Sequence, residues 1–123
     1  MKKEEIDRFE LIQGQLEGLY TEISILTKKT PTDCVNLFKI SYINEIIVEA
    51  NKILSSAYKP SKSFEIFNTD DLPTNSDVVF ILSQYLKCFE KLRRDNIKTG
   101  LNSYWYWNIK DSNISKRTYS PKV

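Results

Sequence analysis

The amino-acid sequence predicts an all-α protein, in which three long antiparallel helices form a bundle and an aromatic C-terminal segment packs on it or beside it. Apolar residues recur at alternating spacings of three and four in three long stretches, which is the period of a helix facing a core. Three glycines and four prolines are too few for a loop-rich β-sandwich. The length of 123 residues fits one domain. We divide it into a helical bundle over 1–100 and an aromatic, then basic, segment over 101–123.

The first helix is expected over residues 3–29. Its apolar positions are spaced 3, 4, 3, 4 and 3 apart, as in the a/d seam of an antiparallel bundle. Lys28 and Lys29 stand at the end where the helix dipole favours cations. The predicted seam consists of Phe9, Ile12, Leu16, Leu19, Ile23 and Leu26.

The second helix is expected over residues 31–56. Thr30 is the predicted N-cap, Pro31 takes the first helical position and Asp33 completes a capping box. Apolar residues cover much of its circumference, so we expect it to be the inner helix. Its predicted stripe consists of Val35, Phe38, Tyr42, Ile46, Ala50, Ile53 and Ala57, broadened by Ile43, Ile47 and Leu54.

Residues 59–73 predict a loop, in which Phe64, Ile66 and Phe67 tuck against the bundle. The third helix is expected over 75–98, with Thr74 and Asp77 as its capping pair and Gly100 as its C-terminal stop. Its predicted core positions are Val78, Leu82, Tyr85, Phe89 and Leu92.

Four large aromatic residues stand in a row after Gly100. A strand there would place Trp105, Trp107 and Ile109 on one face. The row fits a lid that covers the open groove of the bundle, and it also fits an anchor for a protein partner, because Trp and Tyr dominate interface hot spots. The candidate partner-binding residues of this row are Tyr104, Trp105, Tyr106 and Trp107.

The chain beyond Lys110 is polar and basic, and we expect it to be mobile unless something binds it. Aromatic residues beside cations could stack the bases of single-stranded nucleic acid while the cations meet phosphates. The candidate nucleic-acid residues are therefore Lys110, Lys116 and Arg117. The formal net charge of +2 is too close to balance to indicate nucleic acid by itself.

Gly14 and Gly18 lie in the interior of the first predicted helix, where each glycine costs about 1 kcal/mol relative to alanine. They fall outside the core seam, on a second stripe with Leu11, Thr21 and Ile25. Small residues there would allow another backbone to approach closely. We hypothesise that this stripe contacts a partner or a second copy; a local bend or a contact with the chain's own C-terminal segment are the alternatives.

Several function classes are excluded or disfavoured by residue content. Without histidine, the Ser-His-Asp triad, the Cys-His pair and His-ligated metal are excluded. Cys34 and Cys88 lack ligand-like spacing and are expected to be reduced thiols within helices of a cytoplasmic protein. No glycine-rich phosphate loop, membrane span or signal-peptide core is found. We therefore expect no metal, no cofactor, no membrane association and no enzymatic activity.

The remaining expectation is a non-enzymatic protein–protein interaction module. The abundance of Ile, Lys, Asn and Tyr, residues with A/T-rich codons, suggests a small bacterial or phage accessory subunit with an immunity, antitoxin-like, inhibitor or adaptor role. Its partner would be another protein or a second copy in a homo-oligomer. The alternative is a nucleic-acid-binding accessory subunit that uses the aromatic and basic C-terminal segment.

Overall fold

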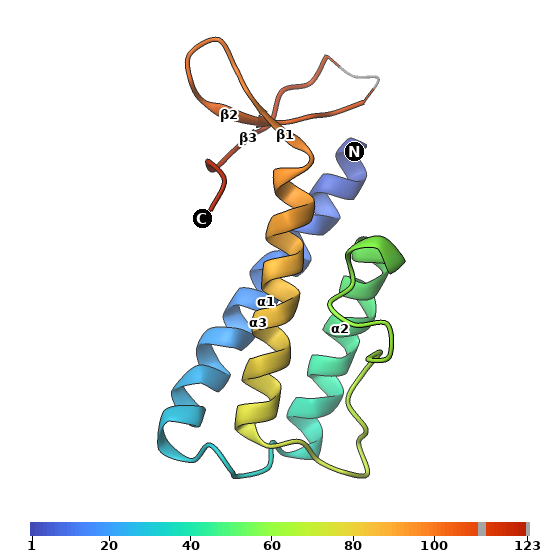
Figure 1. Cartoon of the computed structure of the whole chain (residues 1–123), viewed down its shortest axis with the longest axis vertical. Helices are drawn as coiled ribbons and strands as arrows, with labels where there is room; N and C mark the ends of the chain where they lie inside the picture. Colours follow the sequence, from blue (N-terminus) through green and yellow to red (C-terminus); the bar gives the residue numbers. More distant parts are fainter. Residues whose placement is uncertain (111–112, 123) are drawn as a thin grey trace.

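The computed structural model describes residues 1–110 and 113–122. Three helices form a bundle in which α1 runs antiparallel to α2 and α3, and a small antiparallel sheet closes its upper end (Figure 1). The predicted helical bundle is confirmed, but the expectation that all three helices alternate in direction is wrong. The long loop after α2 returns to the lower end, so α2 and α3 run in the same direction. Its elements are α1 (Lys3–Lys29), α2 (Leu37–Tyr58), α3 (Asn75–Arg94), β1 (Ile97–Thr99), β2 (Trp105–Trp107) and β3 (Arg117–Thr118).

The core follows the predicted seams of α1 and α3. Phe9 of α1 and Phe89 of α3 stack with ring centroids 4.8 Å apart near the upper end of the bundle. Leu19 and Leu26 are half-buried and pack against the core, whereas the other predicted α1 positions are fully buried. All five predicted α3 positions are buried.

The start of α2 differs from the prediction by six residues. The helix begins at Leu37, and the side chain of Asn36, not Thr30, caps it by accepting a hydrogen bond from the Lys39 amide. Residues 31–36 are held in a non-helical connection because they bond to the start of α3: Cys34 forms a β-bridge with Thr74. The prediction of a helix start at 31 is therefore wrong, and Cys34 is exposed in a loop.

The buried stripe of α2 also differs from the predicted one. Ile46 and Ala50 are buried as expected, but Phe38 is 83% exposed and Tyr42 is 45% exposed. The reason is that α2 carries two apolar stripes, and its contacts with α1 and α3 cover only one of them. The covered stripe consists of Ile40, Ile43, Ile47, Ala50 and Leu54, with Ile46 at its edge.

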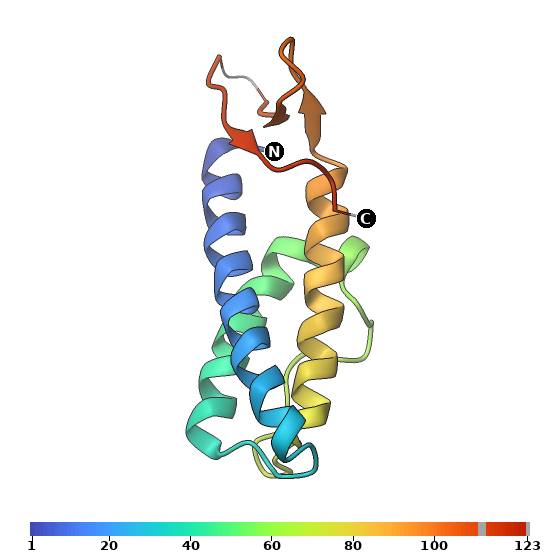
Figure 2. The same cartoon turned by 90° about the vertical axis from the view of Figure 1, so that its left-hand side faces the viewer.

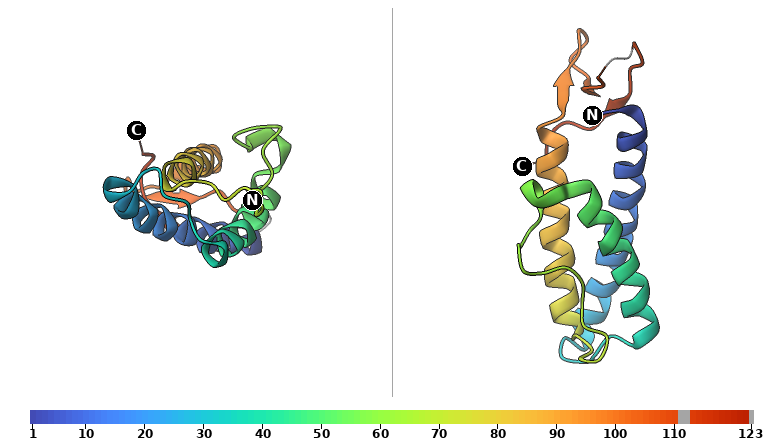
Figure 3. Two further views of the ribbon diagram at one scale, coloured as in Figure 1. Left: turned by 90° about the horizontal axis from the view of Figure 1, so that it is seen from below. Right: turned by 90° about the vertical axis from the view of Figure 1, so that its right-hand side faces the viewer.

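The loop between α2 and α3 lies along the seam of these two helices (Figure 3). Asn44, buried in α2, donates to the carbonyl and accepts from the amide of Phe67, both at 2.9 Å. Phe67 is buried and Phe64 packs edge-on against Tyr85. Ile66 is exposed, so the expectation that it tucks against the bundle is wrong.

The chain leaves α3 after Arg94, four residues before the predicted end, and enters the sheet. The strands follow the order β1-β2-β3, with Ile97 opposite Trp107 and Trp105 opposite Thr118. The Asn96 side-chain amide donates a hydrogen bond to the Leu92 carbonyl, and the Asn96 backbone carbonyl accepts one from the Asn108 amide. These two bonds fix the direction in which the chain leaves the helix. A strand was one conformation considered for residues 105–107, and its two partner strands were not predicted. Gly100 belongs to the β1–β2 turn and does not stop α3.

Candidate protein interface

Trp107 closes the upper end of the core. Its side chain is 2% exposed, and its ring meets Phe9 edge-to-face at 5.2 Å between centroids. Its indole N–H donates to the Glu10 carboxylate at 3.3 Å. Because a buried indole of this kind contributes core packing, Trp107 is part of a lid and offers no surface to a ligand.

The other three aromatic residues of the row are graded in exposure. Trp105 and Tyr106 are half-buried, and Tyr104 is exposed. The Arg117 guanidinium lies 3.8 Å from the centroid of the Tyr104 ring, a cation–π contact between the loop before β2 and β3. The row is thus mainly the packed lid, one of the two forms left open by the sequence.

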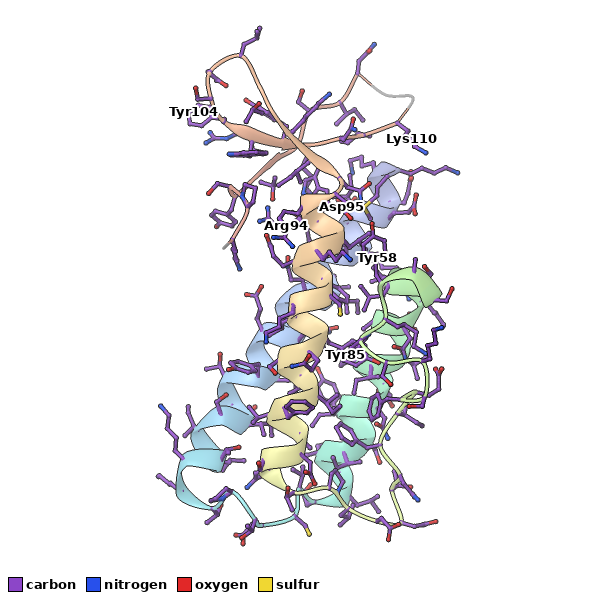
Figure 4. All side chains as sticks on the ribbon, in the orientation of Figure 1. Tyr58, Tyr85, Arg94, Asp95, Tyr104 and Lys110 are labelled. Carbon is purple, nitrogen blue, oxygen red and sulfur yellow. The ribbon has the colours of Figure 1, made fainter. Side chains whose placement is uncertain are left out.

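The three cations predicted for nucleic acid do not form one patch. Lys116 pairs with Asp7 at 2.7 Å and with Glu10 at 2.5 Å, so its charge is compensated within the chain. These contacts raise the pKa of Lys116, the hydrogen bond to Asp7 contributing most, and Lys116 in turn lowers the pKa of Asp7. The Arg117 guanidinium lies over the ring of Tyr104. Tyr104 and Lys110 are on opposite sides of the sheet, so Arg117 and Lys110 are far from each other (Figure 4).

Arg93 fastens the end of the chain to the bundle. This buried guanidinium forms a bidentate ion pair with Glu90 at 2.8 and 2.9 Å. It also donates to the Thr118 hydroxyl and to the carbonyls of Tyr119 and Ser120 at 2.7–2.9 Å. Mobility was expected only of an unbound end, and residues 116–120 are bound by the chain's own helices as they cross from α1 to α3 (Figure 2).

Each pair of helices forms one seam, and the described chain covers two of the three. The loop that contains Phe64 and Phe67 covers the α2/α3 seam. The segment after β3, held by Arg93, crosses the upper part of the α1/α3 seam (Figure 2). No described segment crosses the outside of the α1/α2 seam, as the right-hand view of Figure 3 shows.

Exposed apolar side chains gather on this uncovered side. The ion pair between Arg8 of α1 and Glu49 of α2 marks the outside of the seam. Steps of three and four residues along each helix from these two positions stay on the same face. We call this surface the α1/α2 outer face and define it by Leu11, Gly18, Glu22 and Ile25 of α1 with Phe38, Tyr42 and Glu45 of α2.

The two helix-interior glycines lie on the surface. A Cβ atom built on Gly14 or on Gly18 meets no other atom within 4 Å. Gly18 lies on the α1/α2 outer face, whereas Gly14 lines a hollow beneath the segment that follows β3, together with Gln13 and Tyr119. The described chain therefore gives no packing reason for a glycine at either position.

No family model, curated protein or solved structure matches this chain. Its functional interpretation therefore rests on its own geometry. Within residues 1–110 and 113–122, no three His, Cys, Asp or Glu side chains are grouped to hold a metal ion. Within the same residues, no helix has both the length and the apolar content needed to cross a membrane.

Sequence reasoning placed Phe38 and Tyr42 in the core and thereby missed their place on the α1/α2 outer face. The choice of N-cap for the second helix could have indicated their exposure. Asn36 is as good a cap as Thr30, and a helix that begins after it has a complete apolar stripe without either aromatic residue. Two aromatic residues left over at spacing i, i+4 then indicate a second contact face.

Proposed function

We propose that this chain is a non-enzymatic cytoplasmic protein whose task is to bind another protein chain through the α1/α2 outer face. The observation that carries the proposal is the exposure of Phe38 and Tyr42 on the one seam that no described segment covers. Single exposed apolar residues are ordinary on protein surfaces. Two aromatic side chains one turn apart, with Leu11 and Ile25 exposed at 62% and 55% across the seam, form a larger feature.

The composition of this face fits a protein partner. Aromatic residues are enriched at the centres of protein interfaces, and charged residues are found at their rims. Phe38 and Tyr42 supply such a centre, and Glu22 and Glu45 supply charges beside it. Gly18 adds a place on α1 where a second backbone can approach closely, because no atom of the described chain lies within 4 Å of a Cβ built there.

Two free thiols support a cytoplasmic setting. Cys34 and Cys88 are unpaired, Cys34 being exposed and Cys88 half-buried. Free, accessible thiols are typical of reducing compartments. An accessory or adaptor role in a bacterial or phage system is the form of this function that the residue composition favours.

Capture from the source cells tests this function. The tagged full chain would be expressed beside its untagged native copy, and the bound proteins compared with those of Phe38→Asp/Tyr42→Asp. Leu101→Asp is the matched control, because Leu101 is fully exposed in the β1–β2 turn at the other end of the molecule. Circular dichroism verifies that all three chains fold.

We expect at least one protein, either the untagged copy or a different chain, that binds the unaltered chain and the Leu101 variant but not the double variant. The same set of captured proteins from all three baits would contradict the proposed function.

A further inference from the structure

The outward face of α3 carries a row of cations that have no carboxylate partner in the described chain. Lys87, Lys91 and Arg94 follow one another at i, i+4 and i+7 and are exposed. None of them forms an ion pair with a residue that the structure describes, although Lys91 lies 5.9 Å from the centroid of the Tyr58 ring. Phe80, 61% exposed, stands on the same stripe nearer the start of the helix. We call Phe80, Lys87, Lys91 and Arg94 the α3 outer face.

The α1/α2 outer face carries carboxylates with which such cations can pair. Glu22 and Glu45 lie beside its aromatic pair and have no ion-pair partner in the described chain. In a three-helix bundle, the outward face of one helix points away from the seam of the other two. The view along the bundle shows this arrangement, with α3 on one side and the α1/α2 seam on the other (Figure 3). Cations without an ion-pair partner on one side of the molecule therefore face away from carboxylates without a partner on the other side, among the described residues.

The order of residues along the bundle also matches between the two faces. Both α2 and α3 begin at the lower end (Figure 1). At 1.5 Å per residue, Phe38 lies about 2 Å and Glu45 about 12 Å above the start of α2. On α3, Phe80 lies about 8 Å and Lys87 about 18 Å above the start. Both separations between the aromatic residue and the charge are therefore about 10 Å along the axis.

We propose that a second copy of this chain occupies the α1/α2 outer face and presents its α3 outer face to it. The two copies point in the same direction and are displaced along the axis by about one helical turn. This displacement brings Phe80 of one copy to Phe38 of the other, and Lys87 to Glu45. The proposal rests on the proposed function and names the partner.

The pairing of two different faces has a consequence for assembly. After binding, one copy keeps its α3 outer face free and the other keeps its α1/α2 outer face free, so a third copy can add to either end of the pair. The product is an open row of parallel bundles and not a closed symmetric dimer. Ion pairs between the faces make its formation sensitive to salt, because screening weakens exposed charge pairs.

Analytical ultracentrifugation of the purified full chain tests the proposal with three proteins. The unaltered chain should increase in mass with concentration past two copies, and less so at high salt. Lys87→Glu/Lys91→Glu has a defective α3 outer face, and Phe38→Asp/Tyr42→Asp a defective α1/α2 outer face. Each variant alone should remain at the mass of one chain.

Mixing the two variants gives the decisive result. One variant retains an intact α1/α2 outer face and the other an intact α3 outer face, so an equimolar mixture should form a species of two chains and stop there. A fourth protein, Glu22→Lys/Glu45→Lys/Lys87→Glu/Lys91→Glu, exchanges the charges of both faces and should again associate. It controls for a general loss of folding.

Three results would overturn the inference. The first is an unaltered chain that stays at one copy at all concentrations; capture of a different protein through Phe38 and Tyr42 would then leave the proposed function standing. The second is a mixture of the two variants that fails to form a two-chain species. The third is co-purified material absorbing at 260 nm that high salt removes and that Lys87→Glu/Lys91→Glu no longer retains, which would assign the α3 outer face to nucleic acid.

Discussion

Arg93 and Glu90 lie one turn apart on α3 and form a bidentate ion pair that is almost fully buried. The same guanidinium holds the Thr118 hydroxyl of β3 and the carbonyls of Tyr119 and Ser120 in the segment after it. A pair that looks like an ordinary surface pair in the sequence is therefore the attachment point of the C-terminal segment. The segment covers the upper α1/α3 seam because this attachment exists.

Arg93→Ala should detach this segment and lower the free energy of unfolding by about 2–3 kcal/mol, because charged hydrogen bonds are lost and Glu90 keeps a half-buried charge. Chemical denaturation measures the loss, and hydrogen exchange at residues 118–120 shows where it occurs. Arg94→Ala is the matched control: Arg94 is the next residue, exposed and unpaired, and its loss should change stability by less than about 0.5 kcal/mol. Equal effects of the two substitutions would contradict the attachment.

The ion pair also predicts how stability depends on pH. Burial alone would raise the pKa of Glu90, but hydrogen bonds from Arg93 and from the Lys122 amide outweigh it and lower the pKa. A carboxyl group with a lower pKa in the folded state stabilises the fold above its unfolded pKa of about 4.3, and this contribution disappears as the pH falls through the folded value. Glu90→Gln should therefore flatten the decline in unfolding free energy between about pH 5 and pH 3. Arg93→Met should flatten it in the same way, and an unchanged slope in both variants would refute the assignment.

Replacement of glycine by alanine should raise the stability of the chain at two of the three positions and lower it at the third. Gly14→Ala and Gly18→Ala place a methyl group in open space on α1 and should each raise stability by about 0.5–1 kcal/mol, measured by thermal unfolding of the dilute chain. In Gly100→Ala, the new Cβ would lie 2.5 Å from Cε2 of Tyr106, and that ring must move. We expect Gly100→Ala to destabilise the sheet. Loss of stability at Gly14 or Gly18 would show that α1 requires these glycines by itself.

Ser55 interrupts the last turn of α2 with a backbone angle φ of 55°, although its neighbours are helical. A left-handed φ strains any residue with a Cβ by about 1–3 kcal/mol, and glycine avoids this cost. Ser55→Gly should therefore raise the unfolding free energy by about 1 kcal/mol, after glycine's greater freedom in the unfolded chain is subtracted. Ser56→Gly, at a helical position, should lower it by about 0.5 kcal/mol. Equal losses at both positions would mean that Ser55 is not strained.

Burial of Tyr85 yields a spectroscopic prediction. Burial raises the pKa of Tyr85 to about 12, and its hydroxyl donates to Asn51 at 2.5 Å. A raised tyrosine pKa means that the neutral form stabilises the fold, so this contribution disappears as the pH rises through about 12. Absorbance titration should show a phenolate that forms last, and Tyr85→Phe should remove that component. A Tyr85→Phe curve identical in shape to that of the unaltered chain would contradict the assignment.

Sequence patterns predicted those features of the fold that a single stretch of the chain determines by itself. The spacing of apolar residues in α1 and α3 predicted their buried seams, and Thr74 with Asp77 predicted the start of α3. The start of α2 was not predictable in this way, because the bridge between Cys34 and Thr74 joins residues forty positions apart. That bridge decides between two good caps, Thr30 and Asn36.

The candidate interface was predicted only in part for the same reason. The exposure of Gly18 and Leu11 follows from their place opposite the α1 seam. The exposure of Phe38 depends on which stripe of α2 the other two helices cover, and the burial of Trp107 depends on its contacts with Phe9 and Glu10, nearly one hundred residues away. Such contacts leave no periodic trace in the sequence.

Hydroxyl-radical footprinting of the tagged chain, isolated from its source cells with whatever it binds, tests the central claim most directly. We expect Phe38 and Tyr42 to be protected from oxidation relative to the dilute single chain, while Leu101 and Tyr119, exposed at the other end of the bundle, react equally in both samples. Oxidation of Phe38 and Tyr42 at the same rate in both samples would contradict a docking role for the α1/α2 outer face.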